Sequence, residues 1–333
     1  MRNQGEDNKL FIGVDLGGTN MRAGAVNSSG QVSHRLSLPT RANRGPEEVI
    51  ERIVSTVLKV IDQVKSQGDW VEAVGIGSPG IIDIRTGTVV TSPNFPEWRR
   101  IPLKQIMEKR LPYPVFLDND ANAFAYGEKW VGVGKNVQSM VCLTLGTGVG
   151  GAIILGGRLW HGADGMAGEV GHMTVKPNGL KCNCGNYGCL ESYASASSVV
   201  RRVTAAIRTG TPSIILNLAD GDLEKITSTL VYQAALKGDP LAMQVMKETA
   251  TFLGIGIANL INLLNPEMIV VGGGLANAWD LIYPIAEDEI CRRAFLTLAK
   301  TAKICKASLG DDAGIIGAAG IACFSMQDVS CAF

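Results

Sequence analysis

One histidine and three cysteines are spaced closely enough to bind a metal ion, in the order His172, Cys182, Cys184 and Cys189. One imidazole and three thiolates form a ligand set that holds zinc tetrahedrally. Two glycines between the last two cysteines allow the loop to fold back around an ion. The alternative is three reduced core cysteines beside an unrelated histidine, but a lysine and two asparagines make this segment too polar for a core strand. Because the four ligands leave no position for a catalytic water, we expect a structural zinc site.

Three glycine-rich turns each follow an apolar, strand-like segment. In such turns the backbone N–H groups can approach a phosphate closely, and a threonine hydroxyl adds a donor. A single turn of this kind is more often a plain hairpin, but ligands of α/β proteins bind where strands end, and three such strand ends favour nucleotide binding. The carboxylate of Asp15 could face a metal ion held by the phosphates. The candidate nucleotide-binding residues are Asp15, Gly17, Gly18, Thr19, Asn20, Gly146, Thr147, Gly148, Gly273 and Gly274.

A run of polar residues, Asp118-Asn119-Asp120, follows the short apolar strand expected at 115–117. One of the two carboxylates could simply cap the helix that begins near Ala121. A carboxylate at a strand end is also where a general base is placed to accept a proton from a substrate hydroxyl. In phosphoryl transfer such a base accepts the proton as the hydroxyl attacks the phosphorus.

Strands and helices alternate in the segments that position these residues. Alternating or buried strands are expected at 10–15, 21–26, 31–38, 71–77 and 115–117, and a helix with a 3.6-residue period begins at Pro46. In the second half, strands are expected at 140–145, 152–155, 158–160, 268–271 and 303–306. Helices are expected at 191–208, 222–236, 239–264, 278–298 and 313–325. This alternation is typical of an α/β protein with covered sheets.

The succession of strand, glycine-rich turn, strand, tight turn and strand occurs at the N-terminus and again about 130 residues later. Chance recurrence of glycine-rich hairpins is the alternative. We interpret the repeat as two related lobes, which agrees with about two domains for a chain of 333 residues.

The composition restricts the classes of protein to consider. Thirty-one basic and 31 acidic residues give no net charge, which argues against a nucleic-acid partner. The N-terminal decapeptide is polar, unlike a signal peptide, and no apolar run is long enough to span a membrane. Three of the eight cysteines fall in one cluster, which does not resemble a disulfide framework. We therefore expect a cytoplasmic protein.

Taken together, these segments resemble the ROK family of sugar kinases and repressors. The similarity rests on Asp15 to Thr19, Leu145 to Gly151, Glu169 to His172 and Cys182 to Glu191, and it extends from about Leu10 to about Ala322. The cysteine segment is highly specific, whereas actin, Hsp70 and hexokinases share the glycine turns. The resemblance implies two actin-like (RNase H-like) ATPase lobes with a zinc-binding loop. We expect the first lobe at 1–122, completed by a C-terminal helix at 314–333, and the second at 123–313. Residues 325–333 have no counterpart that we can place.

The resemblance also implies the roles of individual residues. Asp120 would be the catalytic base, and His172 would ligate zinc as well as contact the sugar. The implied sugar-binding residues are Gly80, Asn94, Asn119, Asp120, Glu169, His172 and Glu191.

The resemblance implies an ATP- and Mg²⁺-dependent kinase that phosphorylates glucose to glucose 6-phosphate, assembled as a homodimer or homotetramer. Kinases for N-acetylmannosamine, N-acetylglucosamine or fructose fit the same residues, and polyphosphate could replace ATP. A sugar-responsive repressor is disfavoured, because only 14 residues precede Asp15 and family repressors carry an N-terminal helix-turn-helix domain. A sugar-binding module without catalysis is disfavoured by Asp120 and the three glycine turns.

Overall fold

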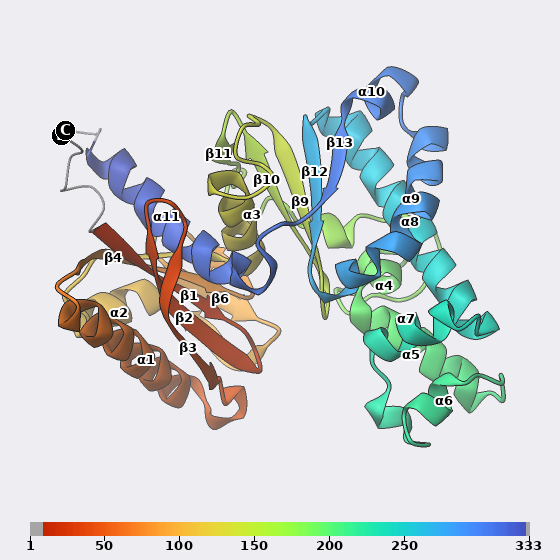
Figure 1. The fold of residues 1–333 in the computed structure, drawn as a ribbon, viewed down its shortest axis with the longest axis horizontal. Helices are drawn as coiled ribbons and strands as arrows, with labels where there is room; N and C mark the ends of the chain where they lie inside the picture. Colours follow the sequence, from red (N-terminus) through yellow and green to blue (C-terminus); the bar gives the residue numbers. More distant parts are fainter. Residues whose placement is uncertain (1–8, 331–333) are drawn as a thin grey trace. The chain divides into compact units, whose positions relative to one another are not determined.

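The computed structural model describes residues 9–330, and the contacts within the chain divide it into two compact units (Figure 1). Among the described residues, the first unit comprises 9–137, 153–167 and 307–330, and the second comprises 138–152 and 168–306. This division differs from the expected boundary at 122/123, because residues 123–137 and 153–167 group with the first unit. The first eight residues, on which the signal-peptide prediction falls, and the last three of the tail lie outside the described residues.

The first unit is built on a five-stranded sheet in the order β3-β2-β1-β4-β8. The pairs β1–β2 and β2–β3 are antiparallel, whereas β1–β4 and β4–β8 are parallel. These strands lie where the alternating and the continuously apolar segments predicted them: β1 (Lys9–Leu16), β2 (Asn20–Asn27), β3 (Val32–Pro39), β4 (Trp70–Ser78) and β8 (Val115–Asn119).

Helices cover both faces of this sheet (Figure 1). Successive residues of β1 pack on opposite faces of the sheet: Ile12 contributes to a core shared with α1, whereas Phe11 belongs to a cluster shared with α11. Glycines in the central strands let α11 approach closely, since a Cβ on Gly75 would lie 1.8 Å from the carbonyl oxygen of Ala318. The helical elements are η1 (Ala42–Arg44), α1 (Pro46–Ser66), α2 (Leu103–Arg110), α3 (Asp120–Trp130), η5 (Gly310–Asp312) and α11 (Ala313–Ser330).

Helix α3 belongs to the first unit because it packs against α11. A Cβ on Gly317 of α11 would lie only 1.6 Å from the carbonyl oxygen of Ala123, so the two backbones are in close contact. The expected boundary divided the chain just where this helix begins, and sequence-local signals do not reveal a partner nearly 200 residues away.

A three-stranded antiparallel sheet, which the sequence did not predict, also belongs to the first unit. It comprises β5 (Ile81–Asp83), β6 (Thr88–Ser92) and β7 (Phe95–Ile101). In β7 only Phe95 and Trp98 are buried, and their rings stack with centroids 4.6 Å apart. This spacing of three breaks the period of two by which strands are recognised.

The second five-stranded sheet has the order β11-β10-β9-β12-β13. The first three strands of each half, β1 to β3 and β9 to β11, thus occupy the same places in their sheets, followed by β4 and β8 in one and by β12 and β13 in the other. The structure therefore confirms the predicted repeat. The pairs β9–β12 and β12–β13 are parallel. The strands are β9 (Met140–Leu145), β10 (Val149–Leu155), β11 (Arg158–Leu159), β12 (Met268–Gly272) and β13 (Lys303–Lys306), and the division between the units falls within β10.

Three of the expected helices in the second unit are interrupted or shortened. The helix expected at 191–208 is broken at Ser195, whose side chain accepts a hydrogen bond from the N–H of Ser198 and caps a new helix. The helix expected at 222–236 begins only after Thr227, and the one expected at 278–298 ends before Ala294. The helical elements are η2 (Val170–His172), α4 (Glu191–Ala194), α5 (Ala196–Arg208), α6 (Ile215–Leu218), η3 (Leu223–Lys225), α7 (Ser228–Leu236), α8 (Pro240–Leu264), η4 (Gly274–Ala278), α9 (Trp279–Arg293) and α10 (Leu296–Thr301).

No helix among residues 9–330 combines the length and apolar character that crossing a membrane requires.

Candidate functional site

The first glycine turn joins β1 to β2 and is closed by backbone hydrogen bonds. The N–H of Gly17 donates to the carbonyl of Asn20 at 3.0 Å, and the N–H of Thr40 donates to the carbonyl of Thr19 at 2.7 Å. The carboxylate of Asp15 is not free, because Arg22 on the neighbouring strand donates its Nε–H to Oδ2 at 3.1 Å. A metal ion bound to this carboxylate would therefore share it with a guanidinium.

Four of the candidate residues in the first unit come together in pairs. Asn94, in the turn between β6 and β7, lies against Gly18, where a Cβ would be 2.6 Å from the Asn94 Nδ2 atom. Asn119 donates its Nδ2–H to the carbonyl oxygen of Gly80 at 3.0 Å. A candidate nucleotide residue and a candidate sugar residue are thus neighbours at the first turn.

Asn119 and Asp120 stand at the junction of β8 and α3. The side-chain oxygens of both residues accept from the N–H of Ala121, at 2.8 Å from Asn119 and 2.9 Å from Asp120. The N-cap of the helix is Asn119, so the alternative that an aspartate fills this position is wrong. Asp120 is the first residue of α3, at the strand end where the sequence analysis expected a base.

Asp118, the residue before this pair, is buried and bonded to a histidine that the sequence analysis did not single out. The Nε2 atom of His161 lies 2.7 Å from Asp118 Oδ2. This hydrogen bond raises the pKa of His161 above its ordinary value, against the opposing effect of burial. Forty-three residues separate the pair, and no local pattern in the sequence connects them.

The second glycine turn, between β9 and β10, is hydrogen-bonded to the first residue of α5. The N–H of Gly146 donates to the carbonyl of Gly148, while the carbonyl of Gly146 accepts from the N–H of Ala196 at 2.8 Å. Gly273, at the end of β12, has a φ of +86°, and a Cβ there would lie 2.6 Å from backbone atoms of Leu145. The two glycine segments of the second unit therefore meet at the ends of neighbouring strands.

The predicted metal ligands come together as the spacing indicated. The ligand atoms of His172, Cys182, Cys184 and Cys189 all lie within 4.8 Å of one another. Burial, followed by hydrogen bonds from the neighbouring sulfurs, raises the pKa of the Cys189 thiol to about 12, whereas the N–H of Asn186 lowers the pKa of Cys184. A dication among the three sulfurs would supply the charge that stabilises thiolates, so the donor set fits zinc.

The remaining candidate sugar residues surround this cluster. His172 Nδ1 lies 3.7 Å from Cys182 Sγ, while its Nε2 lies 3.8 Å from a carboxylate oxygen of Glu169. One ring nitrogen thus faces the sulfurs and the other a carboxylate. Glu191 has one carboxylate oxygen 3.8 Å from Cys182 Sγ. Glu169, His172 and Glu191 are therefore grouped by the loop that carries the cysteines.

A cavity of about 600 Å³ in the second unit adjoins the second glycine turn, since Thr147 is part of its lining. Its polar lining also includes Arg201, Thr204 and residues at the start of α7. The hydroxyl of Thr204 is buried without a hydrogen-bond partner among the described residues. Thr147 is the one lining residue that the sequence analysis named; the rest of the lining comes from α5, η3 and the start of α7, where no motif marks it.

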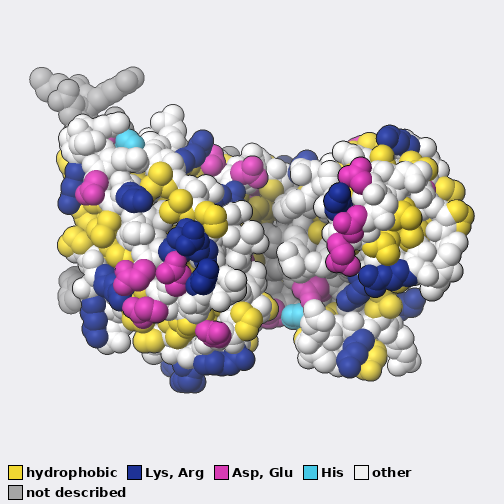
Figure 2. All heavy atoms as spheres, turned by 90° about the horizontal axis from the view of Figure 1, so that it is seen from below, with side chains coloured by type: hydrophobic (Ala, Val, Ile, Leu, Met, Phe, Trp, Pro, Cys, Tyr) yellow, Lys and Arg dark blue, Asp and Glu magenta, His cyan; other side chains and the backbone are white. Residues whose placement is uncertain are grey.

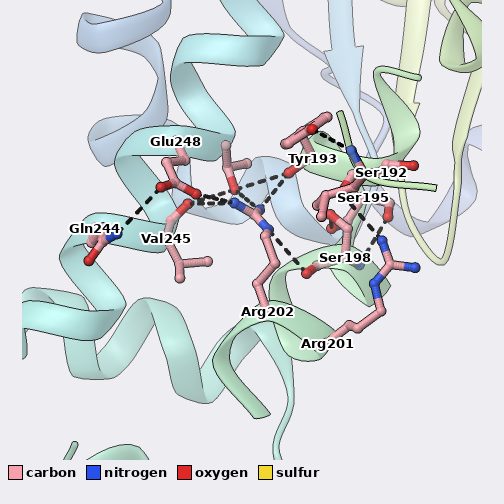
Figure 3. A network of polar contacts seen from close by, with 11 residues as sticks. Ser192, Tyr193, Ser195, Ser198, Arg201, Arg202, Gln244, Val245 and Glu248 are labelled. Atoms are coloured by element: carbon pink, nitrogen blue, oxygen red, sulfur yellow. Dashed lines mark hydrogen bonds and ion pairs between the residues drawn. The ribbon is translucent and has the colours of Figure 1, made fainter. Parts of the chain in front are cut away.

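Arg202, next to Arg201, joins the helix that carries both arginines to its neighbours (Figure 3). Its guanidinium lies between α5 and α8 and donates to the carbonyl of Tyr193 at 2.6 Å and to the hydroxyl of Thr249 at 2.7 Å. Arg201 turns the other way, toward Ser192. Adjacent arginines on one helix thus serve different purposes: one anchors the helix, and the other lines the cavity.

Basic and acidic side chains lie interspersed on the face shown in Figure 2. Ion pairs also join helices within the first unit: Arg110 of α2 lies 3.1 Å from Glu47 of α1.

Comparison with known proteins gives matches over nearly the whole chain. The model of the ROK family matches residues 11–323. A glucokinase from Thermotoga maritima is 40% identical over 93% of this chain and 96% of its own length. The crystal structure of a ROK glucokinase from Streptomyces griseus, in complex with glucose and AMPPNP, has a TM-score of 0.80 at 37% identity and covers 93% of this chain and 98% of that one. A putative xylose repressor from a Caldicellulosiruptor species is 33% identical over 92% of this chain and 76% of its own length.

Proposed function

Because the chain belongs to the ROK family, we propose that it is an ATP-dependent glucokinase, which converts glucose to glucose 6-phosphate. The observation that carries this proposal is the 40% identity to a glucokinase over almost the full length of both chains. The polar junction at Asn119 and Asp120 and the two phosphate-type turns supply residues that suit the reaction.

The proposed reaction transfers the γ-phosphoryl group of ATP to the 6-hydroxyl of glucose. The hydroxyl oxygen forms a bond to phosphorus, the bond from phosphorus to the bridging oxygen of ADP breaks, and Asp120 accepts the hydroxyl proton. Mg²⁺ would neutralise charge that develops on the phosphates. The carboxylate of Asp15 would help to hold that ion, and it would then give up part of its contact with Arg22.

The nucleotide is proposed to bind along the glycine turns and the cavity of the second unit. The backbone N–H groups of the turns suit phosphates, and Thr147 belongs both to a turn and to the cavity lining. The volume and the mixture of hydroxyls, aliphatic side chains and Arg201 suit a nucleoside. Gly273 and Gly274 would leave room beside the bound nucleotide. The candidate residues Gly17, Gly18, Thr19 and Asn20 stay assigned to the phosphates.

The sugar is proposed to contact Gly80, Asn94, Asn119, Asp120, Glu169, His172 and Glu191. Carboxylates, amides and an imidazole are the groups that bind sugar hydroxyls by hydrogen bonds. Zinc is proposed to be structural, held by His172 Nδ1 and the three sulfurs. With that nitrogen on the metal, Nε2 of His172 stays available to a sugar hydroxyl.

A coupled assay of ADP release from purified protein, with ATP and a panel of hexoses, tests this proposal. The expected result is the highest kcat/KM with glucose. A preference for N-acetylmannosamine, N-acetylglucosamine or fructose would change the substrate but keep the reaction class. Turnover with polyphosphate in place of ATP would change the phosphoryl donor but keep the reaction class. Binding of a sugar with no turnover of any hexose would favour a regulator or a binding module.

The expected cytoplasmic location and the homodimeric or homotetrameric assembly stay predictions. Light scattering coupled to size-exclusion chromatography measures the number of chains in the assembly.

A further inference from the structure

The buried carboxylate of Asp118 is surrounded by hydrogen-bond donors from three directions. Its Oδ1 atom accepts from the backbone N–H of Asn119 and from Nδ2 of Asn122, both at 2.7 Å, and its Oδ2 faces His161 Nε2 at 2.7 Å. Only 6% of the Asp118 side chain is exposed, compared with 24% of His161. A buried carboxylate needs such donors, so each of them constrains the position of the others.

Two of these donors belong to the junction that carries the candidate sugar residues. Asn119 is bonded to Asp118 through its own backbone, and Asn122 lies in the first turn of α3. Asp118 therefore ties the end of β8 to the start of α3, and Asp120 sits between the two tied positions. A shift of the Asp118 carboxylate would move the backbone from which Asp120 projects.

His161 comes from a separate segment that is itself held in place. Its carbonyl oxygen accepts from the N–H of Ala167 at 3.1 Å, and the N–H of Trp160 donates to the carbonyl of Ile153 at 2.8 Å. Gly165, with a φ of +90°, lies close enough to β5 that a Cβ would be 3.2 Å from the Ile82 carbonyl oxygen. The imidazole therefore approaches Asp118 from a fixed support, as a positioning group requires.

We propose that His161 is a positioning residue for sugar phosphorylation: through Asp118 it fixes the Asn119–Asp120 junction in the orientation that binds and deprotonates the sugar hydroxyl. This inference rests on the proposed function. The neutral imidazole with its proton on Nε2 and the imidazolium both donate to Oδ2, so the contact persists through changes of charge.

The proposal predicts which kinetic constants change. Misplacement of reacting groups by a fraction of an ångström to 1 Å lowers the rate up to about a hundredfold. Removing the donor should therefore lower kcat/KM for glucose by roughly tenfold or more. The KM for ATP should stay within about twofold, because the proposed nucleotide contacts are made by other residues.

Two substitutions of similar size separate positioning from a general loss of stability. His161→Gln keeps an N–H donor near the place of Nε2, whereas His161→Leu removes it. Kinetics with glucose and with ATP, well below the melting temperature of each variant, give the comparison. We expect His161→Leu to lose kcat/KM for glucose and His161→Gln to recover most of it. If the leucine variant does not fold, His161→Asn, polar but too short to reach Oδ2, takes its place.

The outcomes distinguish this inference from the proposed function. An active wild type together with a leucine or asparagine variant of unchanged kcat/KM for glucose overturns the positioning role alone. A rise in the KM for ATP as large as the loss of kcat/KM for glucose also overturns it, because the substitution then disturbs both substrates alike. So does a kcat/KM for glucose that is as low in His161→Gln as in His161→Leu. A wild type that neither binds nor phosphorylates any sugar of the panel overturns both.

Discussion

Glu191 accepts a hydrogen bond from the backbone N–H of Val149, 3.0 Å away and 42 residues earlier in the chain. The same carboxylate lies next to Gly148, where a Cβ would come within 2.3 Å of its oxygen. This contact joins the second glycine turn to the residue that follows the cysteine cluster. The second glycine turn and the loop that carries the cysteines are therefore joined directly through Glu191.

Loss of this acceptor should destabilise the protein. Glu191→Ala leaves the N–H of the buried residue Val149 without its partner, which costs roughly 1–3 kcal/mol. Glu191→Gln keeps a side-chain oxygen and should cost less. Denaturant unfolding followed by circular dichroism measures both, and equal stabilities of the two variants would contradict this reading.

Asp120→Asn should retain glucose binding but lose turnover. The amide still accepts from the N–H of Ala121, so the start of α3 is preserved, but it cannot accept the hydroxyl proton. Loss of a general base lowers kcat by roughly 10²–10⁴-fold. Steady-state kinetics and calorimetric titration with glucose give the two readouts, with Asp62→Asn, an exposed carboxylate on α1, as the control. A kcat within a few-fold of wild type would remove Asp120 from the base role.

One zinc ion per chain should be present in protein purified without added metal. The reason is the set of four ligand atoms within 4.8 Å of one another. Cys184→Ser should lower both the zinc content and the melting temperature, since metal binding stabilises the folded loop. Cys291→Ser changes an exposed cysteine outside the cluster and should affect neither. Elemental analysis showing less than about half an equivalent in a fully active wild type would rule out the structural zinc.

The two adjacent arginines of α5 should give different phenotypes. Arg201→Ala should raise the KM for ATP several-fold and leave the KM for glucose unchanged, because Arg201 lines the cavity proposed for the nucleoside. Arg202→Ala should instead reduce stability by roughly 2 kcal/mol or more, because several backbone and side-chain acceptors lose a charged donor. Lys237→Ala, an exposed cation at the end of α7, is the control. An unchanged KM for ATP in Arg201→Ala would argue against this placement.

The contribution of His161 to stability should depend on pH. The pKa of His161 is raised by Asp118 above the ordinary value of 6.5, so the folded state holds the proton more tightly than the unfolded state. The extra stability is fully present below about pH 6.5 and is lost as the pH rises through the folded-state pKa. The difference in unfolding free energy between wild type and His161→Gln should thus be larger near pH 6 than near pH 8.5.

Charged groups on the elements that carry His161 and Asp118, or adjoin them, also contribute to the pH dependence of stability. Asp118 is the charged group that contacts the ring. Asp83 on β5 interacts with Arg85, and Glu128 on α3 bonds to the segment at Ser308. Asp120, Arg158 and Asp164 are further charged residues on the same or adjoining segments of the chain. Because these groups are common to both proteins, a difference that does not change with pH would show that the ion pair contributes nothing.

Much of the molecule follows from local patterns in the sequence. Strands such as β1 and β4, the start of α1 at Pro46 and the glycine turns lie where alternation, period and turn residues predicted them, because these signals act over a few residues. The four candidate metal ligands were found by their type and spacing, since a short loop brings them together whatever the rest of the chain does. The family resemblance, which rests on the same segments, was confirmed by the comparisons.

The tertiary structure decided what depends on distant partners. The break at Ser195, the assignment of α3 to the first unit through Gly317 and the sheet of β5 to β7 each depend on packing or capping that no local period records. The bond between His161 and Asp118 crosses 43 residues, and the cavity beside Thr147 is lined by three separate elements. Such contacts form only when the surrounding sheet and helices fix both partners. The sequence alone therefore named Asn119 and Asp120, but not His161, which contacts the neighbouring carboxylate of Asp118.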